Sequence, residues 1–453
     1  MKLPHTPPPL EKLLQSPSPE AVAALLAQPQ PGLPEGRYLH WDELRHRTPP
    51  EGVNHEQWWW GIKVARLAQS QALPLKDKAG SPFLYAMPAP VLRSLHFIDR
   101  DVFGQMRAGQ ILMDSPVANP EDRDRYLVSS LIEEAITSSQ LEGASTTRRV
   151  AEDMLRAGRR PRTLSEHMIF NNYQAMRHLR ALRDEPLTPA LILELHRLLA
   201  TDTLDDPQDA GRLRQDDDIH VVDPRDGRLL HLPPAAAQLP ERLETLCAFA
   251  NGKEEDLPYV HPVLRAILLH FMLGYDHPFV DGNGRTARAL FYWAMARQGY
   301  WLVEYLSISS ILRRAPSQYA RAYLHTETDA GDTTYFLLHQ LDAILQAVDA
   351  LKAYLAEKSR QTRTTEKLLE SADLRGQFNH RQLALLGHAL KHADAIYTVE
   401  SHRASHAIAY ATARADLLRL AELGLLDAQR QGKRFVFAVP GELNTRLRGG
   451  GRR

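Results

Sequence analysis

The feature that most constrains the fold is a long stretch, from Pro120 to about Lys358, in which apolar residues recur at spacings of three and four. This period matches one face of an α-helix and not the alternation of a β-strand. The stretch therefore predicts a mainly α domain of packed helices. The expected helices are 121–140, 148–157, 165–183, 189–200, 239–251, 259–275, 286–300, 307–314, 316–327 and 333–357.

One segment inside this stretch carries chemistry that helix packing does not require. It spans residues 277–288, reads HPFVDGNGRTAR and forms a tight loop that opens a helix. The free N–H groups and the positive dipole end of a helix start favour an anion. Gly282 and Gly284 would let a phosphate approach the backbone closely. Arg285 and Arg288, three residues apart, would lie on one helix face.

Two further side chains of this segment suit the same chemistry. Asp281 is a carboxylate of the kind that holds Mg²⁺ beside substrate phosphates. His277, at the start of the segment, is a candidate proton acceptor. The pattern therefore predicts a clamp for a polyphosphate with a general base at its edge.

The segment resembles the signature of the Fic family, His-x-Phe-x-(Asp/Glu)-Gly-Asn-Gly-Arg-x-x-Arg, at every specified position. The resemblance implies a Fic-type helical bundle that transfers AMP from ATP to a Ser, Thr or Tyr hydroxyl of a target protein. His277 would be the catalytic base, and Asp281 would hold Mg²⁺ across the α- and β-phosphates. The nucleotide-binding residues implied by the resemblance are Gly282, Asn283, Gly284, Arg285 and Arg288.

A second resemblance concerns regulation. Residues 138–143, SSQLEG, close the expected helix at about 121–143 and resemble the inhibitory motif of Fic proteins, (Ser/Thr)-x-x-x-Glu-(Gly/Asn). The resemblance implies that Glu142 pairs with Arg288. That pairing would take up the guanidinium that should bind the γ-phosphate, so the α-phosphate would be misaligned for attack. We therefore predict an autoinhibited enzyme with Ser138 and Glu142 as regulatory residues.

Two short β-type runs interrupt the helical pattern. Residues 219–222 and 229–232 flank the sequence DPRDG at 223–227, which predicts a hairpin turn. In Fic proteins a hairpin at this point in the chain covers the active site and holds the target's extended segment by strand addition. The resemblance implies such a flap at about 218–232. An ordinary surface hairpin is the alternative.

The rest of the chain predicts further domains. Residues 1–119 are expected to form a proline-rich arm and an accessory region that packs on the Fic domain at 120–358. In this region the consecutive Trp58, Trp59 and Trp60 favour an anchoring role over ligand binding. The polar stretch 359–373 is expected to be a linker.

Residues 374–453 resemble a winged helix-turn-helix domain, a fold that places basic side chains in or beside a DNA groove. DNA is therefore a candidate partner, and a protein is the alternative. The candidate phosphate contacts are Arg403, Arg414, Arg419, Arg430, Lys433 and Arg434.

Composition limits the partners and the compartment. Lys and Arg number 55 and are balanced by 55 Asp and Glu, so binding to nucleic acid or to a membrane surface would have to be local. A single cysteine, Cys247, excludes a disulfide framework and a cysteine zinc cluster. The start of the chain has no apolar signal region, and no apolar run is long enough to span a bilayer. We expect a cytoplasmic protein without membrane contacts.

Other functions compete with AMP transfer. Removal of AMP from a modified protein would use the same residues, with Glu142 positioning a water. Transfer of another nucleotide or of phosphocholine is disfavoured by the intact Arg288 and the glutamate. A nucleotide-sensing transcriptional regulator would have no use for His277. The sequence leaves open the target protein, the activating signal and whether the protein is a homodimer. It also leaves open the pocket for the nucleotide base, for which Tyr292 and Trp293 are candidates.

Overall fold

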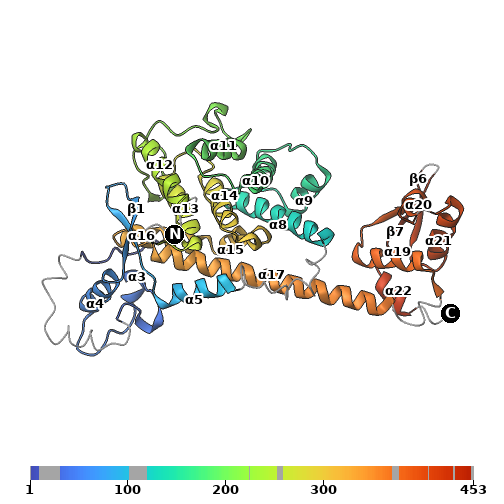
Figure 1. Ribbon diagram of the computed structural model, residues 1–453, viewed down its shortest axis with the longest axis horizontal. Coiled ribbons are helices and arrows are strands. Elements are labelled where there is room, and N and C mark those ends of the chain that lie inside the picture. The colour runs from blue at the N-terminus through green and yellow to red at the C-terminus, as the bar shows by residue number, and fades with distance from the viewer. Residues whose placement is uncertain are drawn as a thin grey trace. The chain divides into compact units, whose positions relative to one another are not determined.

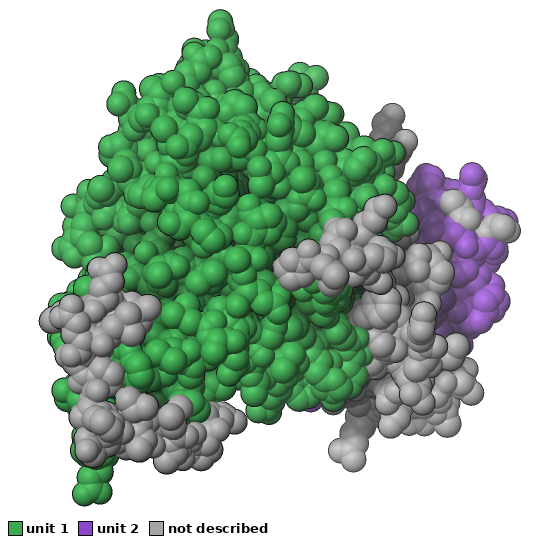
Figure 2. Space-filling model, turned by 60° about the vertical axis from the view of Figure 1, so that its left-hand side comes forward, with its two compact units in different colours: residues 1–351 green, residues 352–453 purple. Residues whose placement is uncertain are grey.

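The computed structural model describes residues 2–9, 31–100, 120–223, 225–252, 259–369, 377–406, 408–431 and 434–449. The chain forms two compact units, Met1–Leu351 and Lys352–Arg453 (Figure 2). The first unit is mainly helical, as predicted (Figure 1). Its helical elements are η1 (Pro34–Gly36), α3 (Trp41–Leu44), α4 (His55–Leu67), α5 (Ala89–Ile98), α8 (Pro120–Leu141), α9 (Arg148–Ala157), α10 (Leu164–Ala181), α11 (Pro189–Ala200), η4 (Pro207–Asp209), η5 (Ala236–Gln238), α12 (Leu239–Ala250), α13 (Pro262–Asp276), α14 (Asn283–Arg297), η6 (Trp301–Tyr305), α15 (Ile308–Arg314), α16 (Pro316–Thr328) and α17 (Thr334–Leu369), which continues into the second unit.

Several of these helices begin at a threonine whose side chain caps the first turn. The hydroxyls of Thr147, Thr163 and Thr188 accept the N–H three residues further on, at the starts of α9, α10 and α11. Such a cap satisfies one of the N–H groups that a helix start leaves without a partner. The proline that follows Thr188 has a backbone angle already suited to the first helical position.

The core of the first unit is built around α13. Every residue of this helix from Val263 to Leu273 is buried. A helix that is apolar on all sides needs neighbours on all sides. It packs against α14 and α12, and α14 in turn contacts α8, α10 and α11 (Figure 1). The junction between α13 and α14 therefore lies deep among helices, with a loop of six residues emerging there.

The first unit also contains two small antiparallel hairpins. One is β1 (Gln71–Lys76) with β2 (Pro82–Tyr85). The other is β3 (Val221–Val222) with β4 (Leu229–His231), at the predicted flap, in which Val221 lies opposite His231. The turn between β3 and β4 is closed by the N–H of Gly227, which donates to the Asp223 carbonyl at 2.8 Å. The proline at position 224 of the predicted turn lies outside the described residues.

The tryptophans of α4 belong to a small apolar cluster. Trp58 and Trp59 are buried there, with Trp60 packed against the cluster. On the same helix, the buried Arg66 donates to the hydroxyl of Tyr335 in α17 at 2.8 Å. Arg66 thus attaches α4 to α17, whereas the tryptophans pack within the N-terminal region, and their anchoring role stays a prediction.

The second unit combines short helices with a three-stranded antiparallel sheet in the order β5-β7-β6. Its core includes Leu386, Leu417 and Phe437. Its elements are α19 (His380–Lys391), β5 (Ile396–Thr398), α20 (Val399–His406), α21 (Tyr410–Glu422), β6 (Asp427–Gln431), β7 (Arg434–Ala438) and α22 (Leu443–Gly449). Its assignment as a winged helix stays a prediction.

One difference from the expected organisation concerns the linker. We expected a helix to end at Glu357 and a linker to follow at 359–373, but α17 continues to Leu369. The stretch 359–367 is polar but has no Gly or Pro, so nothing in it breaks a helix that has already started. Residues 370–376 lie outside the described part. In the part that is described, no helix is both long and apolar enough to cross a membrane.

Candidate active site

His277 lies where α13 ends. It adopts a left-handed backbone with φ 46° and ψ 56°, and its N–H donates to the Leu273 carbonyl at 3.1 Å. This pattern is a common helix stop, and the following Pro278 cannot continue the helix. The local sequence thus ends α13 at the residue predicted to be the base.

The imidazole of His277 has one engaged and one free nitrogen. Its Nδ1 lies 3.2 Å from the Gly274 carbonyl, which can only accept, so Nδ1 carries the proton. Its Nε2 has no hydrogen-bond partner among the described residues. Burial lowers the pKa of His277, against a smaller opposing effect of the Gly274 contact. The neutral ring therefore presents an unprotonated nitrogen, as a general base requires.

Asn283 holds the loop in shape. Its Oδ1 accepts the Phe279 N–H at 2.9 Å, and its Nδ2 donates to the Phe279 carbonyl at 2.8 Å. The residue is only 2% exposed. We expected Asn283 to bind the α-phosphate, and this stays a prediction. The two loop bonds use Oδ1 and one N–H of the side-chain amide, and the backbone N–H at the start of α14 has no acceptor within the helix.

His196 of α11 supports the same loop, and sequence reasoning did not identify it. Its ring stacks on that of Phe279 with centroids 3.7 Å apart. Its Nδ1 accepts the Gly211 N–H at 2.9 Å, so its Nε2 carries the proton and donates to the Asp281 carbonyl, also at 2.9 Å. Burial lowers the pKa of His196 to about 4, which keeps the ring neutral. No local pattern in α11 could have singled it out.

The start of α14 has the features of an anion site. Gly282 precedes the helix with φ 82° and ψ 4°, a conformation that glycine adopts without strain. The N–H groups of the first turn have no acceptor within the helix. At Gly284, an added Cβ would lie 2.1 Å from Glu142 Oε1 and 2.9 Å from an Arg288 nitrogen. The Glu142 carboxylate therefore already lies against the helix start, where an anion is favoured.

The predicted ion pair between Glu142 and Arg288 is present. The two groups are 2.7 Å apart, and Arg288 also donates to the Ser138 hydroxyl at 2.8 Å and to the Ser138 carbonyl at 3.0 Å. Burial alone would raise the pKa of Glu142, but the adjacent Arg288 outweighs it and the pKa lies below its usual range. Both groups are therefore charged at neutral pH.

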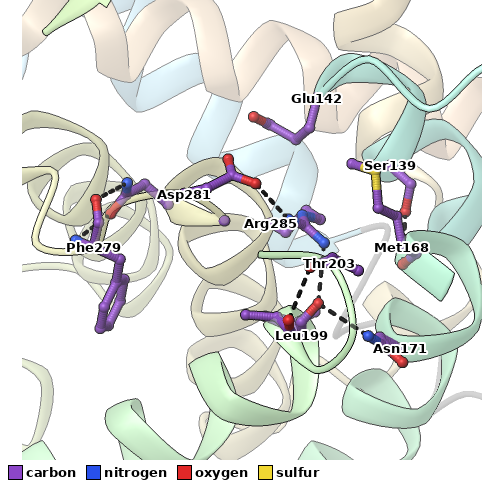
Figure 3. A network of polar contacts seen from close by, with 12 residues as sticks. Ser139, Glu142, Met168, Asn171, Leu199, Thr203, Phe279, Asp281 and Arg285 are labelled. Atoms are coloured by element: carbon purple, nitrogen blue, oxygen red, sulfur yellow. Dashed lines mark hydrogen bonds and ion pairs between the residues drawn. The ribbon is translucent and has the colours of Figure 1, made fainter. Parts of the chain in front are cut away.

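Arg285 is fully buried and lies near Glu142 (Figure 3). One nitrogen donates to the Leu199 carbonyl at 3.0 Å, and another lies 3.2 Å from the Asp281 carboxylate. Its Nε is buried without a partner among the described residues. Figure 3 shows the Asp281 carboxylate directed toward Arg285, with Leu199 and Glu142 on opposite sides of the guanidinium. The predicted nucleotide and metal residues are thus gathered at one place.

Comparisons with known proteins agree with this geometry. The Fic/DOC family model matches residues 186–295, from just before α11 to near the end of α14. Protein adenylyltransferase Fic from Nematostella vectensis is 34% identical over 118 residues, 26% of this chain and 25% of the relative. Protein adenylyltransferase fic-1 from Caenorhabditis elegans is 28% identical over 235 residues, 51% of this chain and 42% of the relative. The chain therefore contains a Fic domain, with the family match at residues 186–295.

A solved structure of a Fic family protein from Desulfovibrio desulfuricans G20 is similar over 78% of this chain and 96% of its own. The TM-score is 0.50 and the identity 17%, a likeness that shows the fold. The chain spans 25% and 42% of the lengths of the two curated relatives. The Fic fold is therefore established, and the activity is argued below from the site.

Whether the site can hold a metal ion depends on Asp281 of the Fic loop. No group of three His, Cys, Asp or Glu side chains that could hold a metal occurs in the described ranges. Mg²⁺ commonly uses one or two protein carboxylates and takes its other ligands from water and substrate phosphates. The Asp281 side chain is 55% exposed, so it can reach such an ion. A single carboxylate beside a phosphate site fits Mg²⁺.

The two aromatic candidates for the base pocket belong instead to the core of the Fic domain. Tyr292 is buried, and its hydroxyl is bonded to the backbone of Leu306 and Ile308. Trp293 is 1% exposed, and its Nε1 donates to the Leu182 carbonyl at 3.2 Å. Both follow the apolar period of α14 into the helix bundle, so neither lines an open nucleotide pocket.

Proposed function

We propose that this protein transfers AMP from ATP to a Ser, Thr or Tyr hydroxyl of a target protein, and that Glu142 restrains the reaction. One observation carries the proposal. His277, whose Nε2 has no hydrogen-bond partner among the described residues, ends α13 just before the loop that leads into α14, and α14 carries the buried Arg285 and Arg288. The relatives named protein adenylyltransferase support the same reaction.

The reaction follows from these groups. The target hydroxyl gives its proton to His277 Nε2 while its oxygen bonds to the α-phosphorus of ATP. The bond from that phosphorus to the oxygen bridging the α- and β-phosphates breaks, and diphosphate leaves with the electron pair. A general base in this role contributes about 10²–10⁴-fold. The proton on His277 then passes to solvent.

The anionic groups of ATP would be held by the first turn of α14. The backbone N–H groups of Gly282, Asn283 and Gly284 would bind the α-phosphate, and Arg285 and Arg288 would neutralise the charge further along. Both guanidiniums are almost fully buried, so their attraction for phosphate is little weakened by water. Asp281 would hold Mg²⁺, which when bound neutralises charge on the phosphates.

The restraint would act through one side chain. Arg288 donates to Glu142 and cannot offer the same N–H to a γ-phosphate. The Glu142 carboxylate also lies at Gly284, where it would repel a phosphate. ATP would bind with its α-phosphate displaced, and misalignment by about 1 Å commonly costs about 10²-fold in rate.

The target would dock on the flap. Val222 of β3 and Leu229 of β4 expose 45% and 48% of their surface, although both are apolar. An extended segment that adds to one of these strands would cover these side chains and pair with the free strand edge.

The test compares the wild type with Glu142→Gly and with Glu142→Gly/His277→Ala, using α-labelled ATP, Mg²⁺ and a host lysate. We expect little labelling by the wild type, strong labelling of itself or of target by Glu142→Gly, and loss of it in the double variant with ATP binding retained. Labelling that survives without His277 above about a tenth of the Glu142→Gly rate contradicts the assignment of the base.

The reverse reaction is tested with the same variants. If Glu142 positions a water that removes AMP from a modified protein, Glu142→Gly loses that hydrolysis. The wild type, given target that Glu142→Gly has modified, then strips the label. A wild type that neither adds nor removes AMP under these conditions leaves restraint as the role of Glu142.

We infer that the second unit binds nucleic acid through α21. Its order of helices and strands supports the winged-helix prediction. The Asp416 carboxylate, which would weaken a basic patch, is buried and bonded to Arg381 at 2.8 Å. Arg414 and Arg419 of α21 are exposed. Lys433 and the side chain of Arg434 lie outside the described residues.

A further inference from the structure

Arg214 lies between the flap and the loop that begins with His277, and it contacts both. It is 4% exposed and was not part of any motif in the sequence. Among the described residues, its side chain is hydrogen-bonded to His277, Asp216, Asp217 and Pro234, and not to the phosphate-binding residues of α14. Its role therefore has to be sought in what it joins.

On the loop side, Arg214 binds two consecutive carbonyls. Its backbone N–H donates to Pro278 at 2.9 Å, and its Nε donates to His277 at 3.0 Å. His277 has φ 46°, a backbone conformation that residues other than glycine adopt only when surrounding contacts stabilise it. The hydrogen bonds from Arg214 are among those contacts.

On the flap side, the guanidinium joins the chain that enters the hairpin to the chain that leaves it. One nitrogen donates to the Asp216 carbonyl at 2.7 Å and to the Asp217 carboxylate at 3.2 Å. The other terminal nitrogen donates to the Pro234 carbonyl. The Asp217 carboxylate also accepts the Ala236 N–H at 2.6 Å. Strands β3 and β4 lie between these attachment points.

A second link attaches the flap to the same region. His231 of β4 donates from Nε2 to the Tyr275 carbonyl at 2.7 Å, and its Nδ1 lies 2.8 Å from the Glu327 carboxylate. Tyr275 precedes His277 by two residues, and the Arg214 contacts follow it. The flap is thus bonded to the chain on both sides of His277, and a shift of the flap would move the backbone that carries the imidazole.

We propose that Arg214 is a positioning residue that couples the flap to His277, so that a target segment docked on the flap also holds the imidazole ready for proton transfer. The proposal rests on the AMP transfer proposed above, because His277 is the base of that reaction. It adds that docking of the target on the flap also orients the imidazole of His277.

The test uses full-length protein in the Glu142→Gly background. Arg214→Met removes every side-chain hydrogen bond, and Arg214→Lys keeps the charge without the planar fork. Arg212→Met is the matched control, since the Arg212 side chain is 46% exposed and pairs with Asp209 at the surface. We expect Arg214→Met to lower kcat for self-labelling by about 10–100-fold with the KM for ATP unchanged. Arg214→Lys should recover part of the loss, and Arg212→Met should match its parent.

Two readouts do not depend on AMP transfer. The charge of Arg214 is among the influences that lower the pKa of His277. In an NMR titration of labelled histidines, Arg214→Met should raise the pKa of His277, whereas Arg214→Lys should leave it in place. Hydrogen exchange of the flap, residues 216–234, should be faster in Arg214→Met than in the Arg212→Met control.

The outcomes are separable. Unchanged flap exchange and an unchanged His277 titration in Arg214→Met overturn the coupling, as does an effect confined to the KM for ATP. If Arg214→Met does not fold, the same measurements on Arg214→Lys decide, with faster flap exchange and reduced kcat expected. A Glu142→Gly parent that transfers no AMP refutes the proposed function, while exchange and titration still decide the coupling.

Discussion

At the scale of single residues, His277 combines a strained backbone with a free ring nitrogen. A left-handed backbone costs a non-glycine residue roughly 1–3 kcal/mol. Here the conformation ends α13 at His277. Neighbours that hydrogen-bond the loop backbone, among them Asn283 at Phe279 and His196 at Asp281, offset that cost.

The pKa of His277 predicts the pH dependence of AMP transfer. Burial is the largest influence and lowers it, so the neutral base persists below the usual histidine value of about 6.5. Activity should fall only as the pH drops through this lowered pKa. In Glu142→Gly, which also lacks a carboxylate that raises the His277 pKa, the acid limb of kcat/KM should have its midpoint below about 6.5. A midpoint at or above that value would contradict a buried, neutral base.

Gly284→Ala should block AMP transfer even without the restraint. An added Cβ lies 2.9 Å from an Arg288 nitrogen and occupies the approach of a phosphate to the helix start. In the Glu142→Gly background, we expect self-labelling to fall by about 10-fold or more. Gly441→Ala is the control, because a Cβ there meets nothing within 4 Å. Equal labelling by the two variants would mean that no phosphate approaches Gly284.

At the scale of elements, the end of α8 lies against the start of α14, and in the proposed restraint Glu142 of the α8 end would compete with nucleotide for groups of α14. Helix α8 is fastened at a distance from the site by Glu134, whose carboxylate accepts the Ser309 N–H at 3.1 Å at the start of α15. Helix α8, whose end carries Glu142, is therefore held in place by a contact that does not involve Arg288. Glu142 can leave Arg288 only if the ion pair breaks or if the whole helix moves.

This competition predicts a difference in stabilisation by ATP. Glu142→Gly should lower the free energy of unfolding by about 1–3 kcal/mol, because Arg288 loses one charged partner but keeps its bonds to Ser138. ATP with Mg²⁺ should then raise Tm more in Glu142→Gly than in the wild type, since nothing has to be displaced. Thermal unfolding with and without nucleotide measures this. Glu152→Gln, at an exposed pair on α9, should respond like the wild type. Equal ATP-induced shifts in all three proteins would argue against competition.

At the scale of the whole molecule, the chain pairs a Fic domain with a second unit whose own core is complete. The equal numbers of acidic and basic residues mean that any nucleic-acid contact must come from a local surface. The exposed Arg414 and Arg419 of α21 are the surface that we propose for this contact, and Glu422 follows them in the sequence.

Duplex binding by the full-length chain should therefore weaken steeply with salt. Phosphate contacts release counterions, and the slope of log affinity against log salt counts them. We expect Arg414→Ala/Arg419→Ala to reduce that slope by about two and to weaken binding across unrelated sequences. Arg183→Ala, at an exposed pair in the first unit, is the control. No binding of a random-sequence duplex pool at low salt would make α21 a protein-binding or packing element.

Much of the fold could be read from local pattern. The helices, the hairpin at β3 and β4 and the loop after His277 were predicted because periodicity, turn residues and short motifs depend on neighbours along the chain. The pairing of Glu142 with Arg288, 146 residues apart, was predicted only from the resemblance to the Fic inhibitory motif. The helix expected to end at Glu357 continues to Leu369, because polarity alone does not end a helix.

Other features depended on the tertiary structure. His196 lies 85 residues from the Asp281 carbonyl that it bonds, and Arg214 lies 63 residues from the His277 carbonyl. No periodicity links positions so far apart, so only the packed helices bring them together. Similarly, the Asn283 motif position predicted a phosphate contact, and the folded loop uses its amide for its own backbone. A short motif names the residues that gather at a site, but which groups are left free there depends on the hydrogen bonds formed once the chain has folded.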